Sequence, residues 1–248
     1  MIIIDAHAHL NFNEFKDDLD EVLDRAKEVG VKAIICNGIN KQSNREILEL
    51  AKKHPIIKPS LGFYPCDCDK LELDEIQEEI EFIKKNNPIA IGEVGLDKKF
   101  DNDFEKQKIY FEKFINLAIE LDIPIIVHSR KAEIECIEML KAANAKKVIM
   151  HCFSGKKKLV QEVIDNGWHL SIPSNVIRSE QFQTMVDICP LRQLLTETDS
   201  PFMSPKKDVS RNEPSFLIDA IKKIAEIKKM DEIELGNIIF SNYQRLFL

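Results

Sequence analysis

The most constraining feature of this chain is an alternation of short apolar runs with longer amphipathic, charged segments, which continues from one end to the other. The short runs are rich in β-branched residues, as buried strands are, and the longer segments have helical periodicity. Eight runs have strand character, at residues 2–6, 32–37, 56–61, 89–93, 123–128, 147–151, 168–172 and 193–196. The predicted helices lie at residues 15–29, 43–53, 73–85, 104–120, 131–143, 157–166, 179–188, 214–228 and 231–246.

Eight strands that alternate with helices in 248 residues fit a (β/α)8 TIM barrel, a fold that typically needs about 250 residues. Periodicity does not show whether a sheet closes, so a doubly wound open sheet is the alternative. We find no linker and no low-complexity segment, and we expect one domain over residues 1–248. In a TIM barrel the active site lies at the carboxyl ends of the strands, so residues at those ends are the candidates for chemistry.

Charge and cysteine content exclude several classes of protein. The 35 basic and 42 acidic residues give a net charge of −7, which argues against a surface built to coat nucleic acid but allows a local basic site. Six scattered cysteines, and a start that enters a strand-like run at once, lead us to expect a cytoplasmic protein with reduced thiols. No apolar stretch approaches the roughly 18 residues of a membrane span, so we expect no membrane partner.

Imidazole and carboxylate side chains stand where the predicted strands end. The first strand leads into two histidines spaced two residues apart, and this spacing puts both side chains on one face of a strand. His54 ends a helix and His169 lies early in the seventh strand, so we expect structural or surface roles for both. The other four histidines and two carboxylates occupy strand ends, and these residues are His7, His9, Glu93, His128, His151 and Asp199.

Six such groups at one barrel mouth would be costly to bury unless charge or metal compensates them. Taken singly, each could be a hydrogen-bonded residue at a strand end, but imidazole and carboxylate together suit zinc and other divalent first-row ions. One ion would leave ligands unused, so we predict two. We place one ion on His7, His9 and Asp199 and the other on His128 and His151, with Glu93 as the bridge.

A pair of metal ions favours hydrolysis. Two-metal sites hold their ions about 3.5–4 Å apart, where they activate a water, polarise the electrophile and neutralise the leaving oxygen. This chemistry hydrolyses both phosphodiester and acyl bonds, and the set of ligands does not show which of the two is the substrate bond. We expect Asp199, at the end of the eighth strand, to serve both as a ligand and as the general base.

The sequence resembles the TatD-type metal-dependent deoxyribonucleases, a branch of the amidohydrolase-like barrels. The resemblance runs nearly end to end, through the segments DAHAHL, GEVGLD, IVHSR, HCFSG, ETDSP, RNEP and SNYQRLF. It implies a metal-dependent hydrolase that cleaves DNA, with the same six residues as the metal and catalytic positions. Many barrels of this kind bridge their metals with a carbamylated lysine, but Glu93 occupies that place here, so we expect a plain carboxylate bridge.

The segment after the third strand departs from the family pattern. Members commonly carry Gly-x-His-Pro there, whereas this chain has GFYP, with Tyr64 in place of the histidine. That histidine resembles a contact to the substrate phosphate, a role in which tyrosine offers one hydrogen bond but no positive charge near neutral pH. Further substrate contacts are expected from Arg130 and Arg211, whose guanidinium groups match phosphate oxygens, and from Ser154 at the start of a helix.

The leading hypothesis is hydrolysis of DNA phosphodiester bonds with two divalent ions, for which zinc, manganese and magnesium are all candidates. DNA or another phosphate-bearing molecule is the expected partner, and no obligatory protein partner is evident. The first alternative is an acyl or ester hydrolase, such as a D-aminoacyl-tRNA deacylase. The second is a barrel that binds without turnover, which the complete set of six residues argues against.

Overall fold

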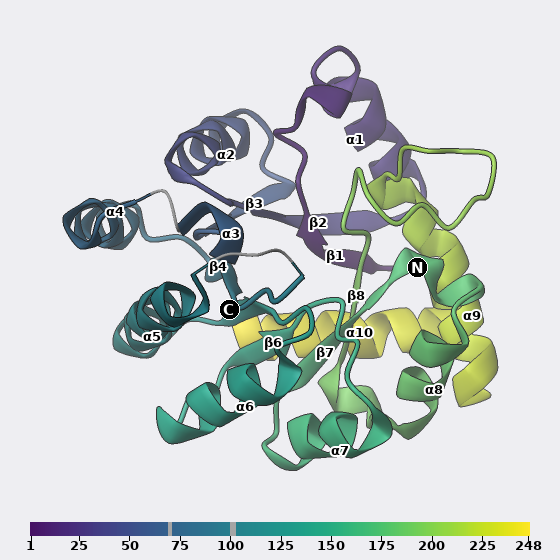
Figure 1. The fold of residues 1–248 in the computed structure, drawn as a ribbon. Helices are drawn as coiled ribbons and strands as arrows, with labels where there is room; N and C mark the ends of the chain where they lie inside the picture. Colours follow the sequence, from purple (N-terminus) through teal and green to yellow (C-terminus); the bar gives the residue numbers. More distant parts are fainter. Residues whose placement is uncertain (69–70, 100–102) are drawn as a thin grey trace.

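Eight parallel strands form the centre of the computed structural model, and each pairs with the next along the chain (Figure 1). The structure describes residues 1–68, 71–99 and 103–248. Because Ser200, just past the eighth strand, forms a bridge to Ala8 at the end of the first, the sheet is a nearly closed barrel, and the predicted (β/α)8 fold is confirmed. The strands are β1 (Ile3–Ala8), β2 (Val31–Asn37), β3 (Ile57–Leu61), β4 (Ala90–Gly95), β5 (Ile125–His128), β6 (Val148–Met150), β7 (His169–Pro173) and β8 (Leu194–Glu197).

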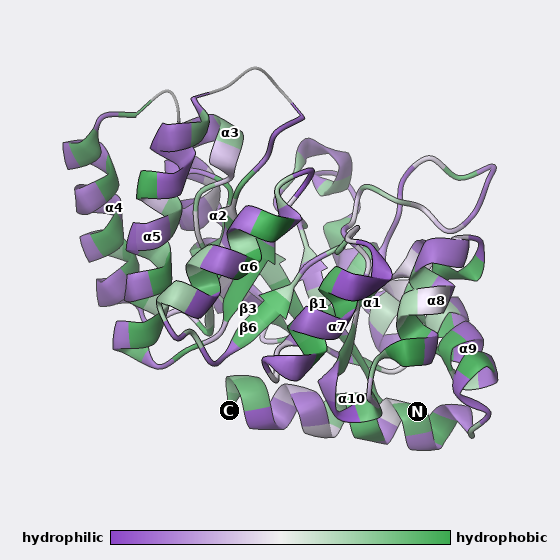
Figure 2. Ribbon diagram, turned by 60° about the horizontal axis from the view of Figure 1, so that its bottom comes forward, coloured by the Kyte–Doolittle hydropathy of each residue, from purple (hydrophilic) through white to green (hydrophobic). Residues whose placement is uncertain are grey.

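Helices surround this ring, and Figure 2 shows apolar strands at the centre with helices of mixed polarity around them. Among the described residues, no helix has both the length and the apolar character needed to cross a membrane. The helices are α1 (Leu19–Glu28), α2 (Lys41–Lys53), α3 (Pro65–Cys68), α4 (Leu73–Asn86), α5 (Phe104–Leu121), α6 (Glu133–Ala142), α7 (Lys157–Asp165), α8 (Glu180–Ile188), α9 (Leu217–Lys228) and α10 (Glu232–Phe247), with 3-10 turns η1 (Asn13–Phe15), η2 (Ser174–Ile177), η3 (Leu191–Gln193) and η4 (Pro214–Phe216).

Helix α10 covers the amino ends of β1 and β8 (Figure 2). The side chain of Asn242 donates to the carbonyl oxygens of Leu191 and Leu194, each at 2.7 Å. Gly236 lies so close to β1 that an added Cβ would be 2.7 Å from the carbonyl oxygen of Ile2, which explains why this position has no side chain. Helix α10 therefore packs on the amino side of the barrel, away from the carboxyl ends of the strands.

The strands are buried on both faces, because one face points into the barrel and the other packs against helices. All six residues of β1 and all six of β4 are buried. This double burial explains why the strands are continuous apolar runs in the sequence. The polar exceptions in these two strands, Asp5, His7 and Glu93, must therefore find partners inside the protein.

The observed elements differ from the predicted ones mainly at their ends. Strand β1 continues to Ala8 rather than ending at residue 6, because Ala8 still pairs with Cys36 of β2. His7 therefore lies within the strand and not just past it. Helix α1 begins at Leu19 instead of residue 15, since η1 occupies the start of that segment. The sequence patterns do not predict the short helix α3.

Hydrogen bonds join the last strand to the first. The Thr196 hydroxyl of β8 donates to the carbonyl oxygen of Ile4 at 2.7 Å. The amide of Asp199, just past β8, donates to the carbonyl oxygen of His7 at 2.9 Å. This seam brings two segments from opposite ends of the chain together at the barrel mouth, and it places two of the predicted metal ligands side by side.

Candidate metal centre

All six predicted ligands gather at the carboxyl ends of the strands. Strand β1 carries one histidine and is followed by another, β4 carries the glutamate, and β5 ends on a histidine. The last two residues follow β6 and β8. All the side chains are largely buried, including the aspartate, which is 15% exposed. The residues are His7, His9, Glu93, His128, His151 and Asp199.

Two of these imidazoles each face the same two carboxylate oxygens, and His7, His9 and Asp199 form one group of potential metal ligands. The Nε2 atoms of His7 and His9 are 3.1 Å apart and lie 3.5 and 3.4 Å from Oε2 of Glu93. The same two nitrogens lie 3.7 and 3.6 Å from Oδ1 of Asp199. A tetrahedral ion with ligand bonds of about 2.0–2.2 Å sets neighbouring ligand atoms about 3.3–3.6 Å apart. The donor types and their spacing therefore fit one divalent ion.

The other oxygen of Glu93 faces a second pair of imidazoles. Its Oε1 lies 2.8 Å from Nδ1 of His128 and 3.9 Å from Nε2 of His151. The ring of His151 also stacks on that of His7, with centroids 3.6 Å apart and planes at 14°. The carboxylate of Glu93 thus contacts both groups of histidines, with one oxygen for each group.

Two carboxylates that sequence reasoning missed orient the second pair of imidazoles. Oδ2 of Asp97 lies 2.9 Å from Nε2 of His128, and Oε2 of Glu197 lies 2.9 Å from Nδ1 of His151. A carboxylate on the far nitrogen fixes the ring and leaves the near nitrogen to bind a metal. Both acidic residues belong to motifs that the sequence analysis used, Asp97 to GEVGLD and Glu197 to ETDSP. Their role depends on where each side chain points, which the motifs do not show.

Opposite charges within the cluster shift its pKa values. Burial by itself would lower the pKa of His9, but contacts with Asp199 and Glu93 raise it to about 10. Burial would also lower the pKa of His151, and the charge of Glu197 raises it to about 9. Burial would raise the pKa of Glu93, but the surrounding imidazoles hold it well below its usual range. Protonated imidazoles thus balance the carboxylates, and a metal ion binding here would displace protons.

Tyr64 lies beside the second pair and is hydrogen-bonded on two sides. Its hydroxyl donates to Oδ2 of Asp97 at 2.7 Å and accepts from Nη2 of Arg130 at 2.8 Å. Nε of Arg130 also lies 3.1 Å from Oδ2 of Asp97. Burial, together with the neighbouring carboxylate, raises the pKa of Tyr64, so the phenol stays neutral. The structure thus places Tyr64 at the site, with its hydroxyl proton engaged by Asp97.

Two adjoining cavities open above the cluster, one of about 530 Å³ and one of about 320 Å³. Tyr64 lines the smaller cavity and Ser154 lines the larger one. The Ser154 hydroxyl donates to Oε1 of Glu133 at 2.7 Å. The two cavities share five lining residues, which are His128, Arg130, His151, Asp199 and Phe202.

Arg211 is held in a separate ion pair. Its Nη1 and Nη2 donate to the two carboxylate oxygens of Asp18 at 2.7 and 2.6 Å. Nη1 also donates to the carbonyl oxygen of Glu14. Within the described part of the chain, the linings of the two cavities do not include Arg211. Of the predicted substrate contacts, the structure therefore brings Tyr64, Arg130 and Ser154 to the cavities.

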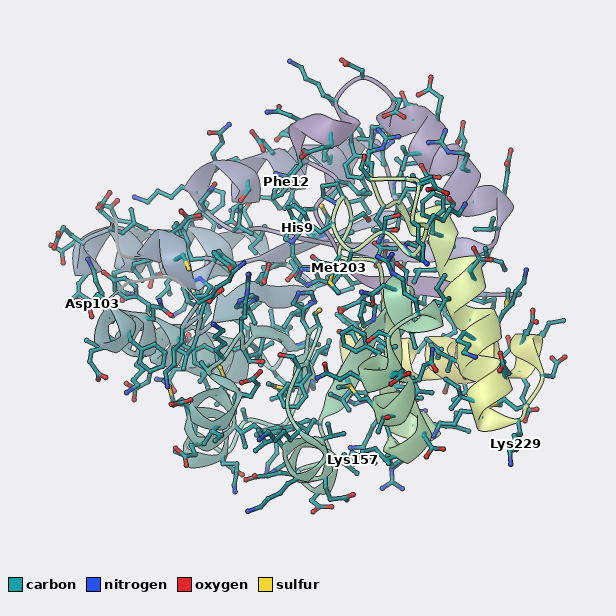
Figure 3. The ribbon with its side chains drawn as sticks, turned by 45° about the vertical axis from the view of Figure 1, so that its right-hand side comes forward. His9, Phe12, Asp103, Lys157, Met203 and Lys229 are labelled. Carbon is teal, nitrogen blue, oxygen red and sulfur yellow. The ribbon has the colours of Figure 1, made fainter. Side chains whose placement is uncertain are left out.

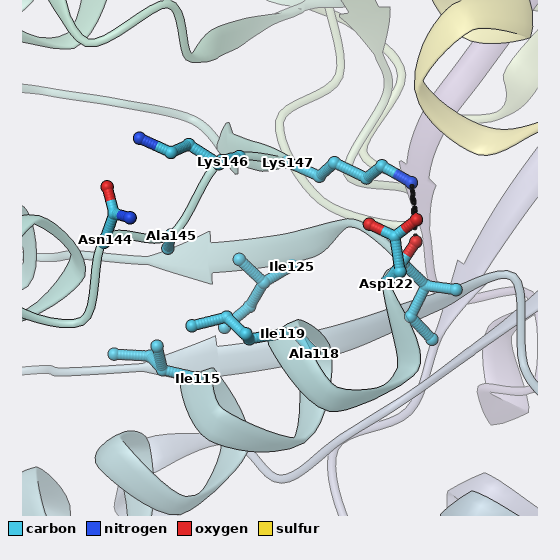
Figure 4. A pocket seen from close by; sticks show the side chains of 10 residues that line it. Ile115, Ala118, Ile119, Asp122, Ile125, Asn144, Ala145, Lys146 and Lys147 are labelled. Carbon is cyan, nitrogen blue, oxygen red and sulfur yellow. Dashed lines mark hydrogen bonds and ion pairs between the residues drawn. The ribbon is translucent and has the colours of Figure 1, made fainter.

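A further groove, of about 90 Å³, lies at the amino ends of the strands (Figure 4). Its walls include apolar side chains such as Ile115 and Ile119 of α5. The carboxylate of Asp122 in this lining pairs with Lys147 at 3.0 Å. Among the described residues, this lining includes no histidine, unlike the cluster at the carboxyl ends of the strands.

Known proteins resemble this chain over nearly its whole length. A Bacillus subtilis protein described as an uncharacterized metal-dependent hydrolase, YabD, is 34% identical, with 99% of each chain covered. The human protein named deoxyribonuclease TATDN3 is 33% identical, with 99% of this chain and 94% of the human chain covered. The crystal structure of YJJV, a TatD homologue from Escherichia coli K12, superposes with a TM-score of 0.90 at 26% identity, with 99% and 97% of the two chains covered.

The family model described as TatD related DNase matches residues 4–248. This match spans every strand that contributes to the cluster, from β1 to β8. The resemblance drawn from the sequence motifs is therefore confirmed, and the chain belongs to the TatD-related DNase family of metal-dependent hydrolases.

Proposed function

We propose that this protein hydrolyses phosphodiester bonds of DNA with two divalent metal ions held by the six clustered side chains. The observation that carries the proposal is the division of the Glu93 carboxylate, whose two oxygens face two different groups of imidazoles. A carboxylate placed in this way can hold two ions at the short separation that paired-metal hydrolysis uses. The name of the human relative, a deoxyribonuclease, supports DNA as the substrate.

The donor atoms on the two sides of the Glu93 carboxylate correspond to two proposed metal positions. Imidazole-rich donor sets favour zinc over magnesium, which prefers oxygen ligands and retains its waters. Such ions, when bound, lower the pKa of a water molecule, polarise the phosphoryl group and neutralise charge on the leaving oxygen. We assign the first position to His7, His9, Asp199 and Oε2 of Glu93, and the second to His128, His151 and Oε1 of Glu93.

We assign the proton transfer to Asp199. It lines both cavities, so its carboxylate is accessible to a molecule that occupies them. Burial would raise its pKa, but the hydrogen bond to His9 and the charges of nearby histidines lower it below the usual value. The carboxylate is therefore ionised at neutral pH, where it can accept a proton from the attacking water and pass it to the leaving oxygen.

Arg130 is the group that we assign to the substrate phosphate. It lines both cavities, and its Nη2 and Nε atoms are held by Tyr64 and Asp97. A guanidinium oriented in advance loses little rotamer freedom when it binds phosphate oxygens. Tyr64 thus positions the arginine, which supplies the positive charge that a tyrosine lacks. Ser154 contributes a polar contact at the edge of the larger cavity.

We expect Glu93→Ala to weaken both metal sites by more than about 100-fold, because losing even an outer partner of a ligand typically costs 10–100-fold and Glu93 contacts both ligand groups directly. His128→Ala is expected to weaken one site and to leave the other nearly unchanged. Calorimetric titration of chelator-stripped protein with zinc measures both affinities. His54→Ala is the control, because this histidine lies beside Asp20 and not among the clustered residues. A Glu93 variant that keeps one site at the parent's affinity contradicts the bridge.

Asp199→Asn is expected to lower kcat by about 10²- to 10⁴-fold while at least one metal ion stays bound. Asparagine keeps the shape and one ligand oxygen of aspartate but does not accept the proton. The kcat and the metal content are measured on the same sample. Activity within a few-fold of the parent, with metal retained, would show that another group takes the proton.

The substrate class is tested with protein that is stripped of metal and then reloaded with zinc, manganese or magnesium. Single-stranded DNA, RNA, an aminoacyl-tRNA and simple esters are offered in parallel. We expect DNA cleavage that depends on the added metal and that falls in the Asp199→Asn variant. Hydrolysis confined to the aminoacyl or simple esters would identify an acyl hydrolase and overturn the proposal.

A further inference from the structure

An aromatic side chain stands at the mouth of both cavities. Phe202 lines each of them and is 49% exposed. Across residues 1–68, 71–99 and 103–248, it is the one aromatic side chain that is exposed. Its amide donates to the carbonyl oxygen of Asp199 at 2.8 Å, and this turn fixes it beside a proposed ligand. Single exposed apolar side chains are common on protein surfaces, so it is the position of Phe202 that sets it apart.

Phe202 extends an aromatic group that begins at the metal centre. The ring of Phe12 stacks on that of His9, with centroids 5.0 Å apart and planes at 18°. Phe202 meets Phe12 edge to face, at 5.9 Å and 77°, and its centroid lies 6.4 Å from that of His9. Figure 3 shows His9 and Phe12 near the middle of the molecule, with Met203, the residue after Phe202, in the same region. The aromatic surface therefore runs from a proposed ligand out to solvent.

The lining of the larger cavity divides into a polar part and an apolar part. Arg130 and Asp199 belong to the polar part, with two of the histidines. Phe182, Phe202 and Met203 are apolar members of the same lining. A nucleotide has the same division, because its charged phosphate and its aromatic base lie on opposite sides of the sugar.

We propose that Phe202, backed by Phe12, is a stacking surface for the nucleobase next to the phosphate that is cleaved. This inference rests on the proposed function and names a side chain that contacts the substrate base. Arg130, Asp199 and Phe202 line the same two cavities, so a nucleotide whose phosphate is held by Arg130 has its base in the space that Phe202 borders. Every base has a π face, so the contact selects an unstacked base and not a sequence. The subsite therefore takes single-stranded or frayed nucleotides, because a base inside a duplex already stacks on its neighbours.

Abasic substitution tests the subsite on zinc-loaded protein. Short single-stranded oligonucleotides carry a tetrahydrofuran residue on one side or the other of the cleaved bond and are compared with the natural strand. For the parent protein we expect KM to be about 5- to 150-fold higher for the abasic strand at one of these positions, which is the range that one base–aromatic stack provides. We expect little change in kcat, since stacking holds the ground state and the transition state alike.

Three variants separate stacking from other effects. Phe202→Leu keeps the apolar bulk but removes the aromatic face, so its KM for the natural strand is expected to rise to that for the abasic strand. Phe202→Trp keeps an aromatic face, so its KM is expected to remain higher for the abasic strand than for the natural strand, as in the parent. Val209→Ala is the matched control, because Val209 is 39% exposed in the same connection between β8 and η4. Fluorescence anisotropy with phosphorothioate strands that are not cleaved measures binding of the natural and abasic strands without turnover.

The outcomes distinguish the subsite from the proposed function. If the ratio of KM for the abasic strand to KM for the natural strand is as large in Phe202→Leu as in the parent, the stacking role is wrong. The proposal of DNA hydrolysis is unaffected by that result. If the parent binds both strands equally, the subsite is also wrong. If the metal-loaded parent cleaves no DNA at all, the proposed function fails, and the inference fails with it.

Discussion

The shared carboxylate of Glu93 is the interaction on which the rest of this site depends. Strand β4 places this one side chain between the two histidines in and just after β1 and the two that end β5 and follow β6. Burying a carboxylate is costly unless positive charge compensates it, so the imidazoles around it must carry protons or bind cations. The same pairing continues outward, where Asp97 and Glu197 each hold one imidazole. Charge compensation thus accounts for the composition of the whole cluster.

The barrel and most of the site follow from sequence patterns, because both are set by the positions of residues along strands. Continuous apolar runs predict strands that are buried on two faces, and the helical segments between them predict parallel pairing. Closure then brings the carboxyl ends of all strands to one place, however far apart they lie in the chain. His7 and Asp199 illustrate this, since a backbone hydrogen bond of 2.9 Å joins them. Residues at strand ends could therefore be grouped before their contacts were known.

The pairings of side chains on loops could not be predicted in the same way, because they depend on loop conformation and rotamer. The guanidinium of Arg211 suits a phosphate, but Asp18 occupies it in the folded chain. Tyr64 lines the smaller cavity, but the hydrogen bonds that join its hydroxyl to Asp97 and Arg130 have no signal in the sequence. An exposed phenylalanine such as Phe202 has no distinguishing pattern in a sequence, and only its place beside the cavities suggests a role.

Diffraction from crystals of the zinc-loaded protein, recorded at the zinc absorption edge, tests most directly whether Glu93 bridges two metal ions. The account predicts two anomalous peaks, one on each side of the Glu93 carboxylate and about 3.5–4 Å apart. The first peak should lie among the donor atoms of His7, His9 and Asp199, and the second beside His128 and His151. A single peak at saturating zinc, or two peaks that do not share Glu93, would contradict it.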